Sequence, residues 1–274
     1  MSPTALTRSS IANIRMTGMK QQLFDLSNKV AIVTGGNGGI GLGMARGLAD
    51  AGANIAIVAR NEAKSNDAVA DLKQRGVKAI PVVTDVTDQA AVGAMVERIK
   101  QELGRIDILV NNAGINIRKP PHALDIAEWH RVIDTNLTSA FLCSQAVHPI
   151  MKATGGGKII NIGSMMSIFG ASFAPAYAAS KGGIVQFTRA CACAWAADNI
   201  QANAILPGWI DTDLTQRARQ EVDGLHGKVL ARTPASRWGE IADFAGIAVF
   251  LSSSASDFVT GTAIPVDGGF SIMG

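Results

Sequence analysis

Seven short apolar runs, rich in Val and Ile, alternate along the chain with segments of helical length. Within each run the apolar residues are consecutive, which is typical of strands buried on both faces of a parallel sheet. This alternation predicts an α/β, doubly wound Rossmann fold: one domain with a seven-stranded parallel sheet and helices on both of its faces. The expected strands are Val30–Thr34, Asn54–Ala59, Ala79–Val83, Ile106–Asn111, Lys158–Ile162, Gln201–Leu206 and Thr262–Val266.

The segments between these runs have the length and period of helices. Open parallel sheets bind their ligands outside the carboxyl ends of the strands, so we expect the functional residues directly after the strands. The expected helices are Ile40–Ala51, Asn66–Arg75, Gln89–Glu102, Ile126–Met151, Ala176–Ala197 and Glu240–Leu251.

The composition supports a buried core and limits the partners. Of the 274 residues, 47% are hydrophobic and 17% are charged, which is enough for a sizeable core. The 25 basic and 22 acidic residues nearly balance at a net charge of +3 and are scattered along the chain, so no nucleic-acid partner is expected. No apolar stretch reaches the roughly 18 residues of a transmembrane helix, so no membrane span is expected.

Three cysteines, Cys143, Cys191 and Cys193, bear on the compartment and on metal binding. Their odd number and the absence of an apolar signal-peptide core favour a reducing, cytoplasmic location. We expect them to be small buried apolar residues. No metal site is expected, because no second cysteine pair or nearby histidine completes a ligand set and the four histidines are dispersed.

The beginning of the chain lacks the pattern of the rest. The first 22 residues are polar and show no hydrophobic period, and we expect residues 1–24 to be an extension that is poorly ordered or lies against a neighbour. A transit peptide is one alternative, and translation from Met16 or Met19 is the simpler one. The Rossmann domain is expected over residues 25–274.

A glycine-rich loop joins the first expected strand to the first expected helix, and it reads Thr34-Gly35-Gly36-Asn37-Gly38-Gly39-Ile40-Gly41. The glycines allow a sharp turn and a close approach of backbone to ligand. The helix that follows offers free N–H groups and the positive end of its dipole to phosphates. In this strand–loop–helix context, the loop predicts a dinucleotide-binding site.

The loop pattern T-G-x-x-x-G-I-G resembles that of the short-chain dehydrogenase/reductase family. The resemblance covers the chain from about Leu26 to its end, and it implies an NAD(P)-dependent oxidoreductase that transfers a hydride between the nicotinamide and a secondary alcohol or ketone. Further family motifs follow in order: Asn111-Asn112-Ala113-Gly114, Asn136, Ser164, Tyr177-x-x-x-Lys181, and Pro207-Gly208 with Thr212.

The resemblance also divides the domain into a cofactor half, residues 25–115, and a catalytic and substrate half, residues 116–274. It implies that the following residues bind the cofactor: Gly35, Asn37, Gly39, Ile40, Gly41, Arg60, Asp85, Val86, Asn112, Ala113, Gly114, Tyr177, Lys181, Pro207, Gly208, Ile210 and Thr212.

Arg60, at the end of the second strand, favours NADP(H) over NAD(H). An acidic residue there would bind the ribose 2′-hydroxyl of NAD, whereas Arg can pair with the 2′-phosphate of NADP. Many NADP-preferring relatives also carry Lys or Arg just before the second motif glycine, where this chain has Gly38. Asp85 matches the family residue that meets the adenine; alternatively it caps the next helix, which Thr87 or Asp88 could equally do.

Tyr177 and Lys181 lie four residues apart and therefore share one face of a helix. A nearby ammonium stabilises the phenolate and lowers the pKa of Tyr177, the only tyrosine of the chain, making it a general acid/base. The resemblance assigns Ser164 to the substrate oxygen, with Ser167 as a spare hydroxyl, and Asn136 to a water-mediated proton relay. Alternatively, Asn136 is an interior helix residue that bonds backbone, and Ser164 forms a turn.

The substrate pocket is expected from the segment after Gly114, the segment after Ser164 and the variable region 211–237. Cations gather in the first and last of these, which suits a carboxylate-bearing or polyhydroxylated small molecule; alternatively they face solvent or a neighbouring subunit. The cations are Arg118, Lys119, His226, Lys228, Arg232 and Arg237, and the expected substrate residues are Arg118, Ser164, Met166, Tyr177 and Trp209.

Within the family, residues 116–120 and 231–239 are most similar to the gluconate 5-dehydrogenase and 2-deoxygluconate 3-dehydrogenase type. A 3-oxoacyl-(acyl carrier protein) reductase or general ketone reductase is the first alternative, and a non-catalytic nucleotide-binding scaffold is a remote one. The nearly all-apolar helix 176–197 is expected to be covered on both sides. Together with the tail 266–270, it implies the homotetramer common in the family.

Overall fold

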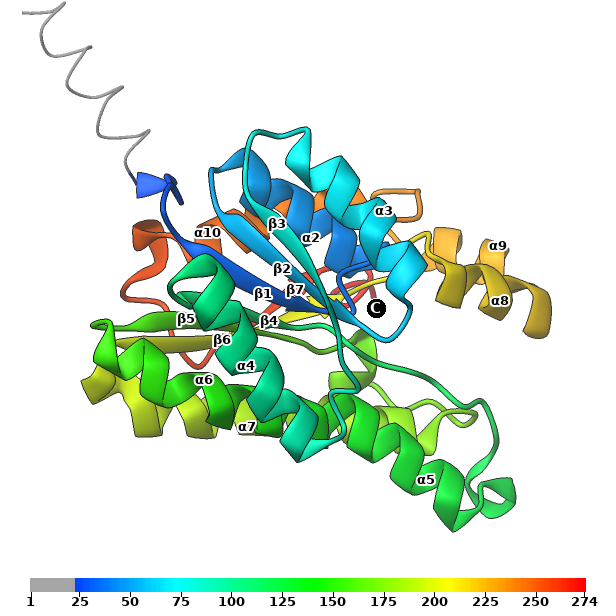
Figure 1. The fold of residues 1–274 in the computed structure, drawn as a ribbon. Coiled ribbons are helices and arrows are strands. Elements are labelled where there is room, and N and C mark those ends of the chain that lie inside the picture. The colour runs from blue at the N-terminus through cyan, green and yellow to red at the C-terminus, as the bar shows by residue number, and fades with distance from the viewer. Residues whose placement is uncertain (1–22) are drawn as a thin grey trace, which may run out of the picture.

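A computed structural model describes residues 23–274. Its seven strands form one parallel sheet in the order β3-β2-β1-β4-β5-β6-β7 (Figure 1), which confirms the predicted fold. The first three strands have the predicted bounds, and the others differ by one or two residues. The strands are β1 Val30–Thr34, β2 Asn54–Ala59, β3 Ala79–Val83, β4 Ile108–Asn111, β5 Gly157–Ile162, β6 Ile200–Pro207 and β7 Ala263–Val266.

Helices cover both faces of the sheet (Figure 1), because each inner strand is apolar on both of its sides. One face packs against α2 (Gly39–Asp50), α3 (Glu62–Lys73) and α10 (Ala245–Ser252). The other packs against α4 (Gln89–Leu103), α6 (Ser139–Ala153) and α7 (Pro175–Trp195). Because helices cover both faces of the sheet, a ligand-binding site can form only at the ends of the strands.

Two predicted helices prove to be interrupted. The segment expected as one helix, residues 126–151, is α5 (Ile126–Ile133), a π-helical turn (Asp134–Thr138) and α6. The segment 240–251 begins with a 3₁₀ turn, Ile241–Phe244, before α10. A π-helical turn inserts one residue without breaking the helix, so hydrophobic periodicity alone does not reveal it.

Two further helices were not predicted, and both lie in the variable region. They are α8 (Asp213–Glu221) and α9 (Leu225–Arg232), and they stand beside the carboxyl ends of the strands (Figure 1). Of its nine residues α8 buries only Ala218, and α9 buries only Leu225 and Val229. So few buried positions give no clear apolar stripe in the sequence.

The cysteine prediction is wrong for one residue. Cys143 and Cys191 are buried, and burial raises the pKa of each thiol to about 12. Cys193 is exposed, because it lies on the side of α7 that faces away from the sheet. Within residues 23–274, no group of three or more His, Cys, Asp or Glu side chains could hold a metal ion, and no helix is long and apolar enough to cross a membrane.

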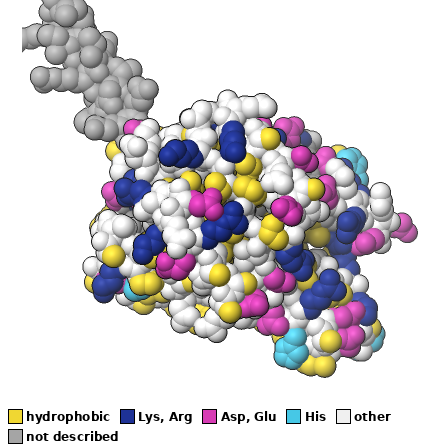
Figure 2. All heavy atoms as spheres, in the orientation of Figure 1, with side chains coloured by type: hydrophobic (Ala, Val, Ile, Leu, Met, Phe, Trp, Pro, Cys, Tyr) yellow, Lys and Arg dark blue, Asp and Glu magenta, His cyan; other side chains and the backbone are white. Residues whose placement is uncertain are grey.

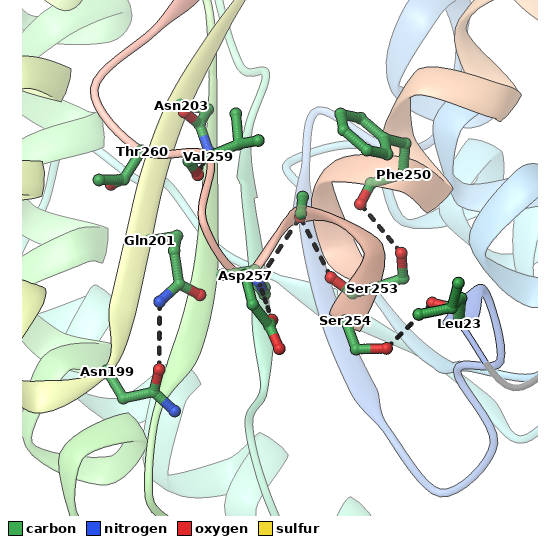
Figure 3. A network of polar contacts seen from close by, with 12 residues as sticks. Leu23, Asn199, Gln201, Asn203, Phe250, Ser253, Ser254, Asp257, Val259 and Thr260 are labelled. Carbon is green, nitrogen blue, oxygen red and sulfur yellow. Dashed lines mark hydrogen bonds and ion pairs between the residues drawn. The ribbon is translucent and has the colours of Figure 1, made fainter.

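The predicted extension 1–24 lies almost wholly outside the described residues. The described chain begins beside the amino ends of the strands, where Ser254 Oγ donates to the carbonyl of Leu23 (3.2 Å; Figure 3). In the same network Gln201 Nε2 donates to Asn199 Oδ1 (3.2 Å). On the face shown in Figure 2, acidic and basic side chains are interspersed, as the near balance of charges implies.

Candidate active site

Three adjoining cavities form one cleft at the carboxyl ends of the strands, where the site was expected. The first, of about 800 Å³, lies beside the ends of β2 and β3, and the second, of about 360 Å³, lies between the glycine-rich loop and α7. The third, of about 90 Å³, lies beyond Tyr177. The first two share Gly35 and Asn37, and the last two share Ser164 and Tyr177.

The glycine-rich loop leaves the beginning of α2 open toward the cleft. No side chain caps α2 and no acidic residue lies in its first turn, so its N–H groups are available to an anion. Gly35 and Gly39 have φ angles of +62° and +52°, which favour glycine. At Gly36 a Cβ would lie 2.8 Å from the carbonyl oxygen of Val33. The loop therefore fits the pyrophosphate of a dinucleotide.

The segment after β4 holds this loop in place. Asn112 Nδ2 donates to the carbonyls of Thr34 (3.1 Å) and Gly35 (3.0 Å), and a Cβ at Gly41 would collide with the same amide. In return, Thr34 Oγ1 accepts from the backbone N–H groups of Asn112 (3.0 Å) and Ala113 (3.1 Å). Gly41 thus acts by packing and is the one expected cofactor residue that does not line the cleft. The buried Thr34 was not predicted as a site residue.

Arg60 and Asp85 both line the first cavity and form an ion pair of 3.7 Å. Asp85 accepts from the backbone N–H (3.0 Å) and the hydroxyl (2.7 Å) of Thr87, which hold the pKa of its carboxyl below the ordinary value. Asp88, not Asp85, caps α4. Of the two alternatives for Asp85, the structure therefore favours a place in the cleft. Lys64, which sequence reasoning missed, lines the same cavity.

Ser164, Tyr177 and Lys181 meet at the second cavity. The Lys181 ammonium lies 5.7 Å from the centre of the Tyr177 ring and donates to the carbonyl of Ile162 (2.6 Å). Ser164 Oγ accepts from the backbone N–H of Met166 (3.1 Å), so Ser164 forms the turn that was its alternative role and still lines the cavity.

Ser167 connects two of these three residues. Its hydroxyl donates to the carbonyl of Lys181 (2.6 Å) and accepts from the backbone N–H of Ser164 (3.1 Å). The spare hydroxyl is therefore engaged with backbone, and it fixes the segment after β5 against α7.

Asn136 is buried in the π-helical turn and lines none of the three cavities. Its Oδ1 accepts from the N–H of Ile115 (2.8 Å), and its Nδ2 donates to the carbonyl of Ile115 (2.9 Å) and to Ser180 Oγ (3.1 Å). A Cβ at Gly114 would lie 3.3 Å from Asn136 Oδ1 and 3.7 Å from Lys181 Nζ. Asn136 thus bonds backbone and stands close behind Lys181.

The pKa expected for Tyr177 is wrong for the protein alone. Burial raises the pKa of the phenol, and the Ser164 hydroxyl and the charge of Arg118 oppose that rise only in part. The ammonium of Lys181, which donates to the carbonyl of Ile162, is not among the groups that shift this pKa. Burial lowers the pKa of Lys181 from 10.5 to about 8.

All five expected substrate residues line the third cavity. Asn116, Phe173 and Leu214 also line it; they lie in the three expected pocket segments but were not named among the substrate residues. The Arg118 side chain is 17% exposed and pairs with Glu221 of α8 at 2.6 Å. Asn116 Oδ1 and Trp209 Nε1 are buried and have no hydrogen-bond partner within residues 23–274.

The other expected cations do not line this cavity. The guanidinium of Arg232 packs over the rings of Phe169 (4.9 Å) and Phe270 (4.5 Å). Arg237 pairs with Asp243 at 2.7 Å. Lys119, His226 and Lys228 are likewise absent from the lining. Of the six cations, only Arg118 reaches the pocket.

The sheet, the open α2 terminus and the Tyr177–Lys181 face define a nicotinamide-dependent dehydrogenase. Residues 35–271 match the family model described as enoyl-(acyl carrier protein) reductase. The chain belongs to the short-chain dehydrogenase/reductase family, as its motifs predicted, and is an oxidoreductase that acts on CH–OH groups.

Within the family, the chain is similar to several enzymes that are named for gluconate or its derivatives. The 2-dehydro-3-deoxy-D-gluconate 5-dehydrogenase of Formosa agariphila is 42% identical over 252 residues, 92% of this chain and 96% of that protein. The 5-keto-D-gluconate 5-reductase of Escherichia coli is 43% identical over 247 residues, 90% and 97% of the two chains. The gluconate 5-dehydrogenase of Burkholderia cenocepacia was solved with NADP and tartrate, and it superimposes with a TM-score of 0.88 at 41% identity. The superposition covers 92% of this chain and 99% of that protein. The predicted resemblance to the gluconate 5-dehydrogenase type is thus confirmed.

Proposed function

We propose that this protein transfers a hydride between NADP(H) and a secondary hydroxyl or ketone carbon of a sugar acid. The observation that carries the proposal is the place of Arg118, in the wall of the cavity that also contains Ser164 and Tyr177. A guanidinium there suits a carboxylate on the same small molecule whose carbon reacts. The names of the relatives, which are gluconate and ketogluconate enzymes, support the same substrate class.

Two unpartnered polar atoms, in side chains that line the cavity, favour a polyhydroxylated substrate. Asn116 Oδ1 is an acceptor and Trp209 Nε1 is a donor, and both are buried without a partner. Leaving such a group unpaired costs about 1–3 kcal/mol. Sugar hydroxyls can both donate and accept, whereas the chain of an acyl thioester would leave both atoms unpaired. The acyl reductase alternative is therefore less well matched by this pocket.

Each group of residues in the cleft has its own role in the proposed reaction. The glycine-rich loop and the beginning of α2 bind the pyrophosphate, and the bound nicotinamide supplies or takes the hydride. Ser164 donates a hydrogen bond to the substrate oxygen. Tyr177 gives that oxygen its proton in reduction and takes the proton in oxidation. Lys181 holds the cofactor ribose and carries a proton toward solvent, and Asn136 positions a water for that relay.

The preference for NADP(H) rests on Arg60. Its guanidinium lines the first cavity, which lies beyond the glycine-rich loop from Tyr177, and its side chain is 69% exposed and free to move toward a phosphate. The Burkholderia cenocepacia relative was solved with NADP, as was a 2-deoxy-D-gluconate 3-dehydrogenase homologue from Agrobacterium tumefaciens.

The test is a set of steady-state assays with gluconate, 5-ketogluconate and an acetoacetyl thioester, each with both cofactors. We expect turnover of the sugar acids, with a higher kcat/KM for NADP(H) than for NAD(H). Turnover of the thioester alone would establish the acyl reductase instead, and no turnover of any ketone or alcohol would favour the scaffold.

We also propose that the protein is a cytoplasmic homotetramer. The side of α7 away from the sheet exposes two polar residues, Gln186 and Arg189, and the small residues Ala179, Ala190, Cys193 and Ala194. Phe141 of the adjacent α6 is 45% exposed. Small side chains let two such helices approach closely, and the apolar area suits an interface. Light scattering on the full chain tests this through the mass of the particle.

A further inference from the structure

Gly38 and Lys64 lie against each other across the cleft end of the glycine-rich loop. A Cβ added at Gly38 would lie 2.9 Å from Lys64 Nζ and 3.0 Å from Lys64 Cε. The Lys64 side chain therefore occupies the space into which a side chain at position 38 would extend. The loop has glycine at this position, and the cation comes from the first turn of α3 instead.

The backbone of Lys64 is held so that its side chain reaches the loop. Asn61 caps α3 by accepting from the N–H of Lys64 (2.9 Å). Asn37 of the loop donates to Ser65 Oγ (3.1 Å), which ties the loop to the same turn of α3. The distance between Lys64 and Gly38 thus follows from anchored backbone on both sides.

Lys64 lines the same cavity as Arg60. The two residues stand four positions apart, one at the end of β2 and one at the start of α3. Lys64 pairs with Asp213 at 3.2 Å, but the two side chains are 49% and 80% exposed. Exposed ion pairs contribute little, about 0–1 kcal/mol. A phosphate dianion, with more charge than a carboxylate, can therefore replace Asp213 as the partner of Lys64.

We propose that Lys64 binds the 2′-phosphate of NADP(H) together with Arg60, and so determines the choice between NADP(H) and NAD(H). The inference rests on the proposed function, because it requires a 2′-phosphorylated cofactor. Positions 38 and 64 are then alternative sources of one cation, since side chains at both would compete for the same space.

The test is calorimetric binding of 2′,5′-ADP and of 5′-ADP to the protein, with no turnover required. Lys64→Met is expected to weaken 2′,5′-ADP binding by about tenfold, the size of one charge-assisted contact, and to leave 5′-ADP binding unchanged. Lys73→Met is the matched control, since Lys73 is an exposed lysine in the last turn of the same helix. A double variant that combines Gly38→Lys with Lys64→Ala, whose short side chain frees the space beside position 38, is expected to restore the binding of 2′,5′-ADP.

The outcomes separate the two proposals. If the unaltered protein binds 2′,5′-ADP no better than 5′-ADP, the NADP preference of the proposed function fails. If the unaltered protein discriminates but Lys64→Met binds 2′,5′-ADP as Lys73→Met does, the preference stands and the role of Lys64 is overturned. If the double variant stays as weak as Lys64→Met, positions 38 and 64 are not alternatives. Equal melting temperatures of the variants exclude unfolding as the cause.

Discussion

Arg118, in the wall of the substrate cavity, forms a 2.6 Å ion pair with Glu221, the last residue of α8. Glu221 thus presents to Arg118 the group that a sugar acid would present. The Glu221 side chain is 52% exposed, so the pair is open to exchange with a carboxylate from solution.

Removal of the guanidinium should therefore act on the affinity for acidic substrates. Arg118→Met is expected to raise KM for a sugar acid by roughly tenfold to a hundredfold, as for the loss of a charge-assisted pair. A neutral polyol should show a much smaller change, because it has no carboxylate to lose a partner. Steady-state kinetics with both substrates checks this, and equal losses for both would contradict it.

Removal of the competing carboxylate should have the opposite effect. Glu221→Gln leaves Arg118 without a charged partner until the substrate binds. We expect KM for a sugar acid to fall about threefold, in line with the small value of an exposed pair. The matched control is Glu97→Gln, on the exposed side of α4. An unchanged or higher KM in Glu221→Gln would show that Glu221 orients Arg118 rather than competes for it.

Tyr177→Phe isolates the proton transfer. It is expected to lower kcat by about a hundredfold to ten-thousandfold, the usual contribution of a general acid or base. Cofactor binding, measured by fluorescence titration, should stay within about twofold, since the phenol oxygen is not part of the phosphate site. Loss of binding together with turnover would instead point to a structural role for the hydroxyl.

The raised pKa of Tyr177 predicts different pH profiles for the two directions. Oxidation needs the deprotonated phenol, so its kcat/KM should rise by about tenfold per pH unit over a range that extends above pH 8. Reduction needs the protonated phenol, which persists through neutral pH, so its profile should stay flat there. Because the charge of Arg118 lowers this pKa, Arg118→Met should move the oxidative profile to higher pH.

We expect Lys181→Met to lower activity and to raise the stability of the folded protein. The unfolded lysine keeps its proton up to about pH 10.5, whereas the folded one loses it near 8. The unfolded state therefore binds more protons between these values, and the stability of the unaltered protein rises with pH across that window. Below pH 8 the buried lysine costs up to roughly 3 kcal/mol. Urea unfolding at pH 7 and pH 10 should show a stabilised variant at pH 7 and a smaller difference at pH 10.

Strand positions were predictable because the inner strands are buried on both faces, so that runs such as Ile55–Val58 carry no polar residue. The roles expected of Tyr177 and Ser164 depended on short motifs that follow strands, and the fold brings these motifs together. Helices α8 and α9 could not be predicted, because they are mostly exposed and lack an apolar stripe. Lys64 was missed for another reason: its sequence neighbours say nothing of Gly38, which it meets only after α2 and α3 pack on the sheet.

The π-helical turn Asp134–Thr138 has a consequence for insertions and deletions in this part of the chain. One residue advances a helix by about 100°, so the apolar faces of α5 and α6 are out of phase by that angle. A deletion of one residue within the turn would leave an unbroken α-helix of ordinary appearance. It would nevertheless rotate Asn136 away from Ile115, or else turn Cys143 and Val147 out of the core. We therefore expect a change of one residue in the length of this segment to destabilise the fold.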